Sequence, residues 1–183
     1  MTLDEMVMKT GKRMPSFSWM LQHLNKTTNP LIIETGCARQ ENNFDGDGMS
    51  TLIFDEYVKE HGGEFHSVDI NPLNTDFAKS KTSLANVHTG DSVKFLHEFN
   101  QQNKKIDLLY LDSYDLDASN PHPSSLHHIF ELVAIMPSLK AGTMICVDDN
   151  LDIGVGKGGY VNEFMNLIGK PKLYSGYQWI WIL

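Results

Sequence analysis

Short apolar segments recur along the chain, and the stretches between them have the length and spacing of amphipathic helices. The segments cover residues 30–36, 64–70, 85–89, 106–111 and 143–147. Short buried strands separated by helices predict βαβ units, and therefore a mostly parallel sheet with helices on both faces. Four of the five segments reach an acidic residue at or just after their end. In such sheets ligands bind beyond the carboxyl ends of the strands, so the pattern predicts an acid-lined cleft at that edge.

The remaining elements follow from apolar spacing and capping residues. One or two helices are expected over residues 2–25, laid on the sheet before the first strand. Further helices are expected over 49–59 (with Ser50 as a cap), 74–83, 92–100, 124–139 and 159–168. The last residues, 172–174 and 178–183, predict a hairpin in which Trp179 and Trp181 pack on one face of the sheet.

Length and composition exclude several classes of protein. At 183 residues, 41% of them hydrophobic, the chain predicts one domain with a full core. The formal net charge of −8 disfavours nonspecific binding to nucleic acid, which needs clustered Lys and Arg. No apolar run approaches the roughly 20 residues that span a bilayer. The first residues lack the apolar core of a signal peptide, and two cysteines without a CxxC exclude a disulfide scaffold. A cytoplasmic protein is expected.

Three of the strand ends carry residues suited to a nucleotide-like ligand. The first strand ends in Glu34-Thr35-Gly36, where glycine allows close approach of a ligand to the backbone. Asp69 ends the second strand, where it can accept hydrogen bonds from ribose hydroxyls or cap the helix after Pro72. Asp91 follows the third strand and either faces an adenine ring or caps the next helix.

Together these residues resemble the class I S-adenosylmethionine-dependent methyltransferases. The resemblance implies a three-layer Rossmann-like fold, with a mostly parallel seven-stranded sheet whose last strand is antiparallel. It divides the single domain 1–183 into an N-terminal helical segment, 1–29, and a cofactor-binding core, 30–183. The glycine loop departs from the family pattern, since Ala38 replaces one glycine and an insertion precedes Gly46. The residues that would bind S-adenosylmethionine are Glu34, Gly36, Ser50, Asp69, Asp91 and Asp112.

The fourth and fifth strands end in Asp112 and in Asp148-Asp149-Asn150. Carboxylates on adjacent strands repel unless a proton or cation lies among them, and oxygen ligands suit Mg²⁺, Ca²⁺ or Mn²⁺. This pattern resembles the metal-dependent, catechol-type O-methyltransferases. The resemblance implies that Asp112, Asp149 and Asn150 bind a divalent metal, Mg²⁺ or Mn²⁺, that holds a substrate hydroxylate. The alternative is that these residues only cap the loops at the strand ends.

The general base is not defined by the sequence. The catechol-type enzymes have a lysine shortly after the fourth-strand aspartate, but this chain has no lysine between Lys105 and Lys140. The candidates are Asp115 after that strand and His127 or His128 downstream, since histidine has a suitable ordinary pKa. Asp112, Asp115 and His128 are the residues expected to take part in catalysis. A metal alone could also suffice, and both histidines could be surface or packing residues.

These observations predict a methyltransferase acting on the hydroxyl of a small molecule or sugar. We expect acceptor recognition by residues 1–29 and the loops 39–47, 115–125 and 151–159, because the core leaves no room for a substrate domain. The alternatives are a noncatalytic binding protein on the same fold and a nicotinamide-dependent oxidoreductase. No nucleic-acid or membrane partner is expected, and the sequence does not indicate the oligomeric state.

Overall fold

The computed structural model describes residues 1–151 and 156–183. The expectation for the loop 151–159 therefore lies partly outside the described residues. The helices are α1 Leu3–Met8, α2 Met14–Leu24, α3 Ser50–His61, α4 Pro72–Lys81, α5 Ser92–Phe99, α6 His122–Ile135 and α7 Gly159–Leu167. The strands are β1 Leu31–Thr35, β2 Glu64–Asp69, β3 Asn86–Thr89, β4 Leu108–Leu111, β5 Met144–Val147, β6 Tyr174–Ser175 and β7 Trp179–Ile182.

The strands form one seven-stranded sheet in the order β3-β2-β1-β4-β5-β7-β6. β1 to β5 pair in parallel, and β7 runs antiparallel to both β5 and β6. The strand order reverses beside β1, between β2 and β4, which is where an open sheet of this kind forms a ligand-binding crevice. The predicted sheet, with its antiparallel strand entered through a hairpin, is confirmed.

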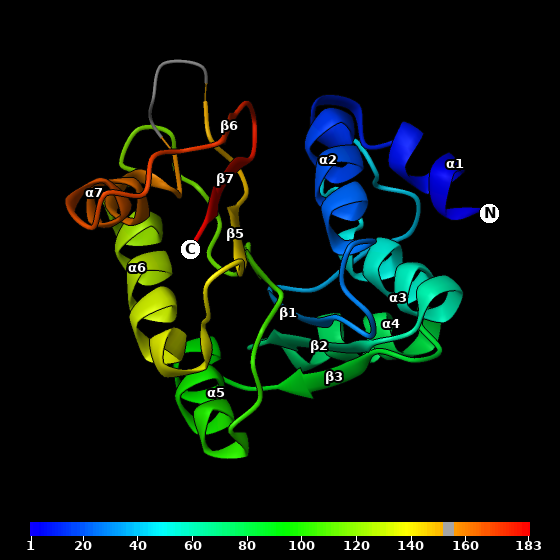
Figure 1. Cartoon of the computed structure of the whole chain (residues 1–183). Helices are drawn as coiled ribbons and strands as arrows, with labels where there is room; N and C mark the ends of the chain where they lie inside the picture. The colour runs from blue at the N-terminus through cyan, green and yellow to red at the C-terminus, as the bar shows by residue number, and fades with distance from the viewer. Residues whose placement is uncertain (152–155) are drawn as a thin grey trace.

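Helices cover both faces of the sheet, as Figure 1 shows, with α1, α2 and α3 on one side and α5, α6 and α7 on the other. Successive strand residues alternate between two cores: Ile32 packs with the first group of helices, whereas Leu31 and Ile33 pack with the second. Trp179 and Trp181 both belong to the second core, as expected for residues two positions apart. The fold is therefore the predicted three-layer arrangement.

The N-terminal residues form α1 and α2, joined by a 3₁₀ turn, Gly11–Arg13. Thr2 and Glu5 cap α1 reciprocally, since each side chain accepts a hydrogen bond from the other's backbone. Leu3 and Val7 of α1 and Phe17 and Met20 of α2 are buried in the first core. The segment therefore packs on the sheet as predicted.

Three predicted helix starts need correction. Helix α6 begins at His122, two residues before the expected start, and ends at Ile135, before the expected end at 139. Helix α3 begins at Ser50, but Ser50 is not its cap: the residue before it, Met49, occupies the cap position in a left-handed conformation with φ of 51°. Helix α4 begins at Pro72 rather than Asn74, because Asn71 caps it and proline is well tolerated in the first turn. Within the described residues, no helix has the length and apolar character needed to cross a bilayer.

Candidate functional site

A cavity of about 260 Å³ opens at the carboxyl ends of the strands. It lies beside the topological reversal and is lined by residues that follow β1, β2, β4 and β5, together with one residue of the N-terminal segment. The lining includes Gly36, Cys37, Arg39, Ser50, Asp69, Ile70, Asn74, Asp112, Ser113, Asp115, Asp149, Lys157 and Arg13. Of the predicted site residues, Gly36, Ser50, Asp69, Asp112, Asp115 and Asp149 thus share one cavity.

The end of β1 crosses closely over the end of β4. Gly36 has a φ of 78°, and a Cβ added there would lie 2.4 Å from the carbonyl oxygen of Asp112. The backbone N–H of Asp112 in turn donates to the carbonyl of Thr35 at 2.9 Å. Only glycine fits both the left-handed conformation and this close approach. The glycine predicted for the cofactor loop therefore brings that loop against the fourth-strand aspartate.

Asp69 organises the adjacent part of the cavity wall. Its Oδ2 accepts a hydrogen bond from the backbone N–H of Cys37 at 3.2 Å, and its Oδ1 accepts one from the N–H of Asn71 at 2.7 Å. The side-chain amide of Asn74 also donates to the carboxylate. Asp69 does not cap the helix after Pro72, because Asn71 is the cap of that helix. Asp69 instead lies at the cavity, where its carboxylate joins the loops after β1 and β2.

Glu34 and Asp91 do not line the cavity. Glu34 is fully buried beneath it, where its Oε2 accepts hydrogen bonds from Thr51 at 2.7 Å and Ser67 at 2.5 Å. Burial raises the pKa of Glu34 to about 7, against the opposing effect of these hydroxyl donors. Asp91 is exposed and caps α5 by accepting from the N–H of Lys94 at 2.8 Å. The capping role for Asp91 is therefore the one that the structure shows.

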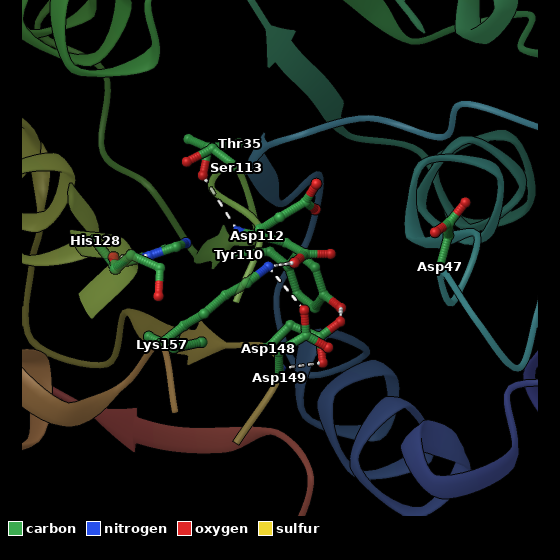
Figure 2. Close-up of polar contacts among 12 residues, drawn as sticks. Thr35, Asp47, Tyr110, Asp112, Ser113, His128, Asp148, Asp149 and Lys157 are labelled. Atoms are coloured by element: carbon green, nitrogen blue, oxygen red, sulfur yellow. Dashed lines mark hydrogen bonds and ion pairs between the residues drawn. The ribbon is translucent and has the colours of Figure 1, made fainter. Parts of the chain in front are cut away.

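The carboxylates after β4 and β5 lie together with two basic side chains. Lys157 reaches between two of them, with Nζ 2.5 Å from Oδ1 of Asp112 and 2.8 Å from Oδ2 of Asp149 (Figure 2). Arg13 donates from Nε to Asp148 at 2.7 Å and from Nη2 to Asp149 at 3.0 Å. Lys157 and Arg13 are 1% and 3% exposed, so the basic groups of all four ion pairs are shielded from water.

The cluster shifts the ionisation of its members in opposite directions. Burial raises the pKa of Asp112 well above its ordinary value, although Lys157 opposes the shift. Burial alone would also raise the pKa of Asp149, but Lys157, with Tyr177 and Arg13, outweighs that effect, so the pKa of Asp149 is lowered. Burial alone would lower the pKa of Lys157, yet the charges of Asp112 and Asp149 hold it above the ordinary value. Lys157 is therefore a fixed cation at neutral pH and not a proton acceptor.

The donor set predicted for a metal does not fit one in this arrangement. Asn150 is fully buried, and its Oδ1 accepts from the N–H of Gly158 at 2.9 Å while its Nδ2 donates to the carbonyls of Val147 and Asp148. Asp112 and Asp149 already share the Lys157 ammonium. In the described part of the chain, no group of three or more His, Cys, Asp or Glu side chains is arranged around a metal position. The structure therefore brings Asp112 and Asp149 together but leaves Asn150 outside the set.

The three candidates for the general base lie in different surroundings. Asp115 is exposed at the cavity mouth and pairs with Arg39 at 3.2 Å. His128 is fully buried outside the cavity lining, its Nδ1 lies 2.6 Å from the carbonyl of Ser124, and burial lowers its pKa to about 4. His127 is half-buried and lies 3.3 Å from the buried carboxylate of Glu131, which raises the pKa of His127. Of these three, the structure brings only Asp115 to the cavity.

Sequence reasoning missed Arg13 and Lys157 as members of the site, and it missed Ser113 in the lining. Lys157 carried a signal, because it stands in a glycine-rich stretch after the acidic end of a strand. Arg13 carried none, since it is separated from Asp148 by 135 positions. Ser113 donates to Glu131 at 2.6 Å and so ties the loop after β4 to α6.

The fold and the cavity together define the class I S-adenosylmethionine-dependent methyltransferases. The sheet is doubly wound with a reversed last strand, and the cavity holds a glycine turn, a second-strand aspartate and the acidic ends of the fourth and fifth strands. Residues 46–150, more than half of the chain, match the methyltransferase-domain family. The chain therefore belongs to that family. No curated protein matches the sequence.

Solved structures with the same fold include three methyltransferases. The calicheamicin methyltransferase CalS11 is 13% identical, with 92% of this chain and 77% of that chain covered and a TM-score of 0.65. The O-methyltransferase NovP is 12% identical, with coverages of 93% and 79% and a TM-score of 0.66. The MycE methyltransferase, solved with Mg and SAH, is 14% identical and has a TM-score of 0.65. The match covers 100% of this chain and 54% of the MycE chain. At these identities the likeness shows the fold.

Proposed function

We propose that the protein transfers the methyl group of S-adenosylmethionine to a hydroxyl oxygen of a small molecule or sugar. The observation that carries the proposal is the single cavity, in which the β1 glycine turn and Asp69 lie beside Asp112 and Asp149. Two of the similar structures are described as an O-methyltransferase and as a TDP-rhamnose 3'-O-methyltransferase. A hydroxyl acceptor is the substrate class that these likenesses and the acidic reacting side of the cavity support together.

The residues present fit the cofactor. Gly36 leaves the backbone open to a ligand, and Asp69 has carboxylate oxygens at the position where a ribose binds in such folds. Ile70 lies in the same lining with 72% of its surface exposed, so it offers an apolar contact for a ring beside that ribose. Three carboxyl groups lie against Arg13 and Lys157, so the reacting side is acidic, which suits a cationic methyl donor.

The remaining steps belong to the chain's own residues. Bound S-adenosylmethionine supplies a methyl group on a sulfonium, so that the acceptor oxygen bonds to the methyl carbon while the carbon–sulfur pair returns to sulfur. Asp112 is the group we assign to receive the hydroxyl proton, because it lines the cavity and burial raises its pKa. Arg39 bridges Asp47 and Asp115 at the mouth and joins two loops expected to recognise the acceptor. Cytoplasmic location, the absence of a nucleic-acid partner and the 1–29 and 30–183 division remain predictions.

The test is ligand binding. S-adenosylmethionine and S-adenosylhomocysteine should each stabilise the protein by about 2.7 kcal/mol at 100 times their Kd, measured by thermal shift. The substitution Asp69→Asn should weaken binding about tenfold to a hundredfold in calorimetry, because a hydrogen bond to a charged group is lost. The matched control Asp76→Asn changes an exposed aspartate outside the cavity lining and should bind as the wild type does.

Two results would contradict the proposal. Absence of a shift with both ligands would remove S-adenosylmethionine as the cofactor and favour a noncatalytic protein on the same fold. Stabilisation by NAD or NADP instead would point to an oxidoreductase. Transfer of a labelled methyl group to a panel of phenols, sugars and nucleotide sugars then tests the acceptor class.

A further inference from the structure

We propose that Lys157 is the resident cation of this site and takes the place that a divalent metal would occupy between the fourth- and fifth-strand carboxylates. The proposal rests on the function proposed above and deepens it: methyl transfer by this protein needs no bound metal. The ammonium group bridges Asp112 and Asp149 at 2.5 and 2.8 Å, as Figure 2 shows. A single buried cation thus joins the two carboxylates on which the expected metal site depends.

The remaining side-chain oxygens of Asp149 and Asn150 are committed as well. Oδ1 of Asp149 accepts from Nη2 of Arg13 at 3.0 Å and from the hydroxyl of Tyr177 at 2.7 Å. The side-chain oxygen of Asn150 accepts from a backbone N–H. A hard cation such as Mg²⁺ needs several oxygen ligands at short distances, so it would have to displace these donors and the ammonium itself.

The backbone fixes Lys157 in this place. Gly156 and Gly158 flank it, and a Cβ at either would lie within 2.8 Å of Asn150 atoms. Asn150 pairs with Gly156 in an antiparallel bridge and accepts from the N–H of Gly158. Residues 156–158 are therefore held tightly against the end of β5, and Lys157, the residue between the two glycines, must project toward the carboxylates. Asn150 therefore holds the backbone on both sides of Lys157 in place and does not act as a metal ligand.

Lys157 supplies one effect that a metal would supply. It compensates the charges of the Asp112 and Asp149 carboxylates and holds both groups in fixed positions. In the balanced reaction, the carbon–oxygen bond forms as the carbon–sulfur bond breaks, and the hydroxyl proton passes to the Asp112 carboxylate. Lys157 is a positioning residue in this step, since its ammonium acts through Asp112.

Binding of Mn²⁺ by metal-stripped protein tests the proposal. The wild type should bind no Mn²⁺ at concentrations up to about 1 mM, followed by the electron paramagnetic resonance signal of free Mn²⁺. Lys157→Ala removes the ammonium and should bind one Mn²⁺ at least about tenfold more tightly than the wild type. Adding Asp112→Asn to that variant should abolish the binding. Lys140→Ala is the matched control, because Lys140 also pairs with an aspartate, Asp107, but away from the cavity lining.

Stoichiometric Mn²⁺ binding by the wild type that Asp112→Asn abolishes would overturn the proposal. Failure of folded Lys157→Ala to bind Mn²⁺ would overturn it equally, because the position would then not be that of a cation. If Lys157→Ala does not fold, Lys157→Met keeps the packing volume and carries the same test. Calorimetric binding of S-adenosylmethionine to the same wild-type sample separates the two proposals, since its absence contradicts the methyltransferase function whatever the metal result.

Discussion

The buried ionisable side chains at and near the site differ in whether a partner of opposite charge stabilises their ionised form. Lys157 and Arg13 find carboxylate partners, and Glu131 accepts from Ser113 and lies near His127, so each of these charges is stabilised by a partner. His128 is different. Its Nε2 has no hydrogen-bond partner among the described residues, and it lies 3.9 Å from Glu131. A buried histidine without a carboxylate at hydrogen-bonding distance is most stable in its neutral form, which makes it sensitive to acid.

Acid should therefore destabilise the protein partly through His128. Burial lowers its pKa to about 4, below an unfolded value of about 6.5, so the unfolded state binds more protons between these values. Its stabilising contribution is present above pH 6.5 and is lost as the pH falls toward 4. Between pH 7 and pH 5 this amounts to about 2 kcal/mol of unfolding free energy, measured by urea denaturation.

The comparison variant His128→Gln cannot titrate and should show a pH dependence smaller by that amount. His97→Gln changes an exposed histidine of α5 and should leave the dependence as in the wild type. Equal slopes for the wild type and His128→Gln would show that His128 is not buried in its neutral form.

At the scale of elements, the junction between β1 and β4 decides the shape of the cavity. The two strands pair in parallel from Ile32 with Leu108 to Thr35 with Leu111. Immediately beyond this pairing, Gly36 turns over the carbonyl of Asp112. The turn exists because one residue combines a left-handed conformation with the absence of a side chain. Both the loop after β1 and the position of Asp112 at the cavity depend on it.

Replacing Gly36 with alanine should lower the free energy of unfolding by more than backbone strain alone would. Gly169 is the matched control, because its φ of 72° is close to the 78° of Gly36, but a Cβ there meets nothing within 4 Å. Gly169→Ala should cost about 1 kcal/mol from its conformation. Gly36→Ala adds a clash with backbone atoms and should cost about 3 kcal/mol or more in urea denaturation. Equal losses would mean that β1 does not approach β4 as described.

At the scale of the whole molecule, the N-terminal segment is tied to both the core and the site. Helices α1 and α2 bury apolar side chains against one face of the sheet. Arg13, at the turn between them, forms ion pairs with Asp148 and Asp149 at the end of β5. The segment before the first strand thus completes the cavity wall, and we predict that residues 1–29 and 30–183 unfold together.

The substitution Arg13→Ala tests this coupling. It leaves the fully buried Asp148 without its cationic partner and should cost about 3–5 kcal/mol. Amide hydrogen exchange should speed up throughout α1 and α2, and wild-type unfolding should be a single transition by fluorescence and circular dichroism. Lys26→Ala, a change at an exposed lysine just after α2, should leave exchange and stability as in the wild type. Two separate transitions in the wild type would show that the segment folds independently.

The sequence by itself determined the strands, the helices and the acidic edge of the sheet. These follow from local patterns: apolar runs that end in Gly or Asp, and capping residues such as Asp91. Since parallel strands place their carboxyl ends at one edge, the meeting of Asp69, Asp112 and Asp149 at one cavity could be predicted without any contact being known.

Only the tertiary structure decided which cations those acids meet. Arg13 comes from a helical turn 135 positions before Asp148, and Lys157 reaches Asp112 across 45 positions. Asn150 reads as a ligand in the sequence, yet it turns inward to hold the backbone of Gly158. Such pairings depend on the path of loops and on close glycine contacts that fix where each side chain projects. Local sequence patterns carry no information on these paths, so the basic side chains that pair with these carboxylates could be read only from the folded chain.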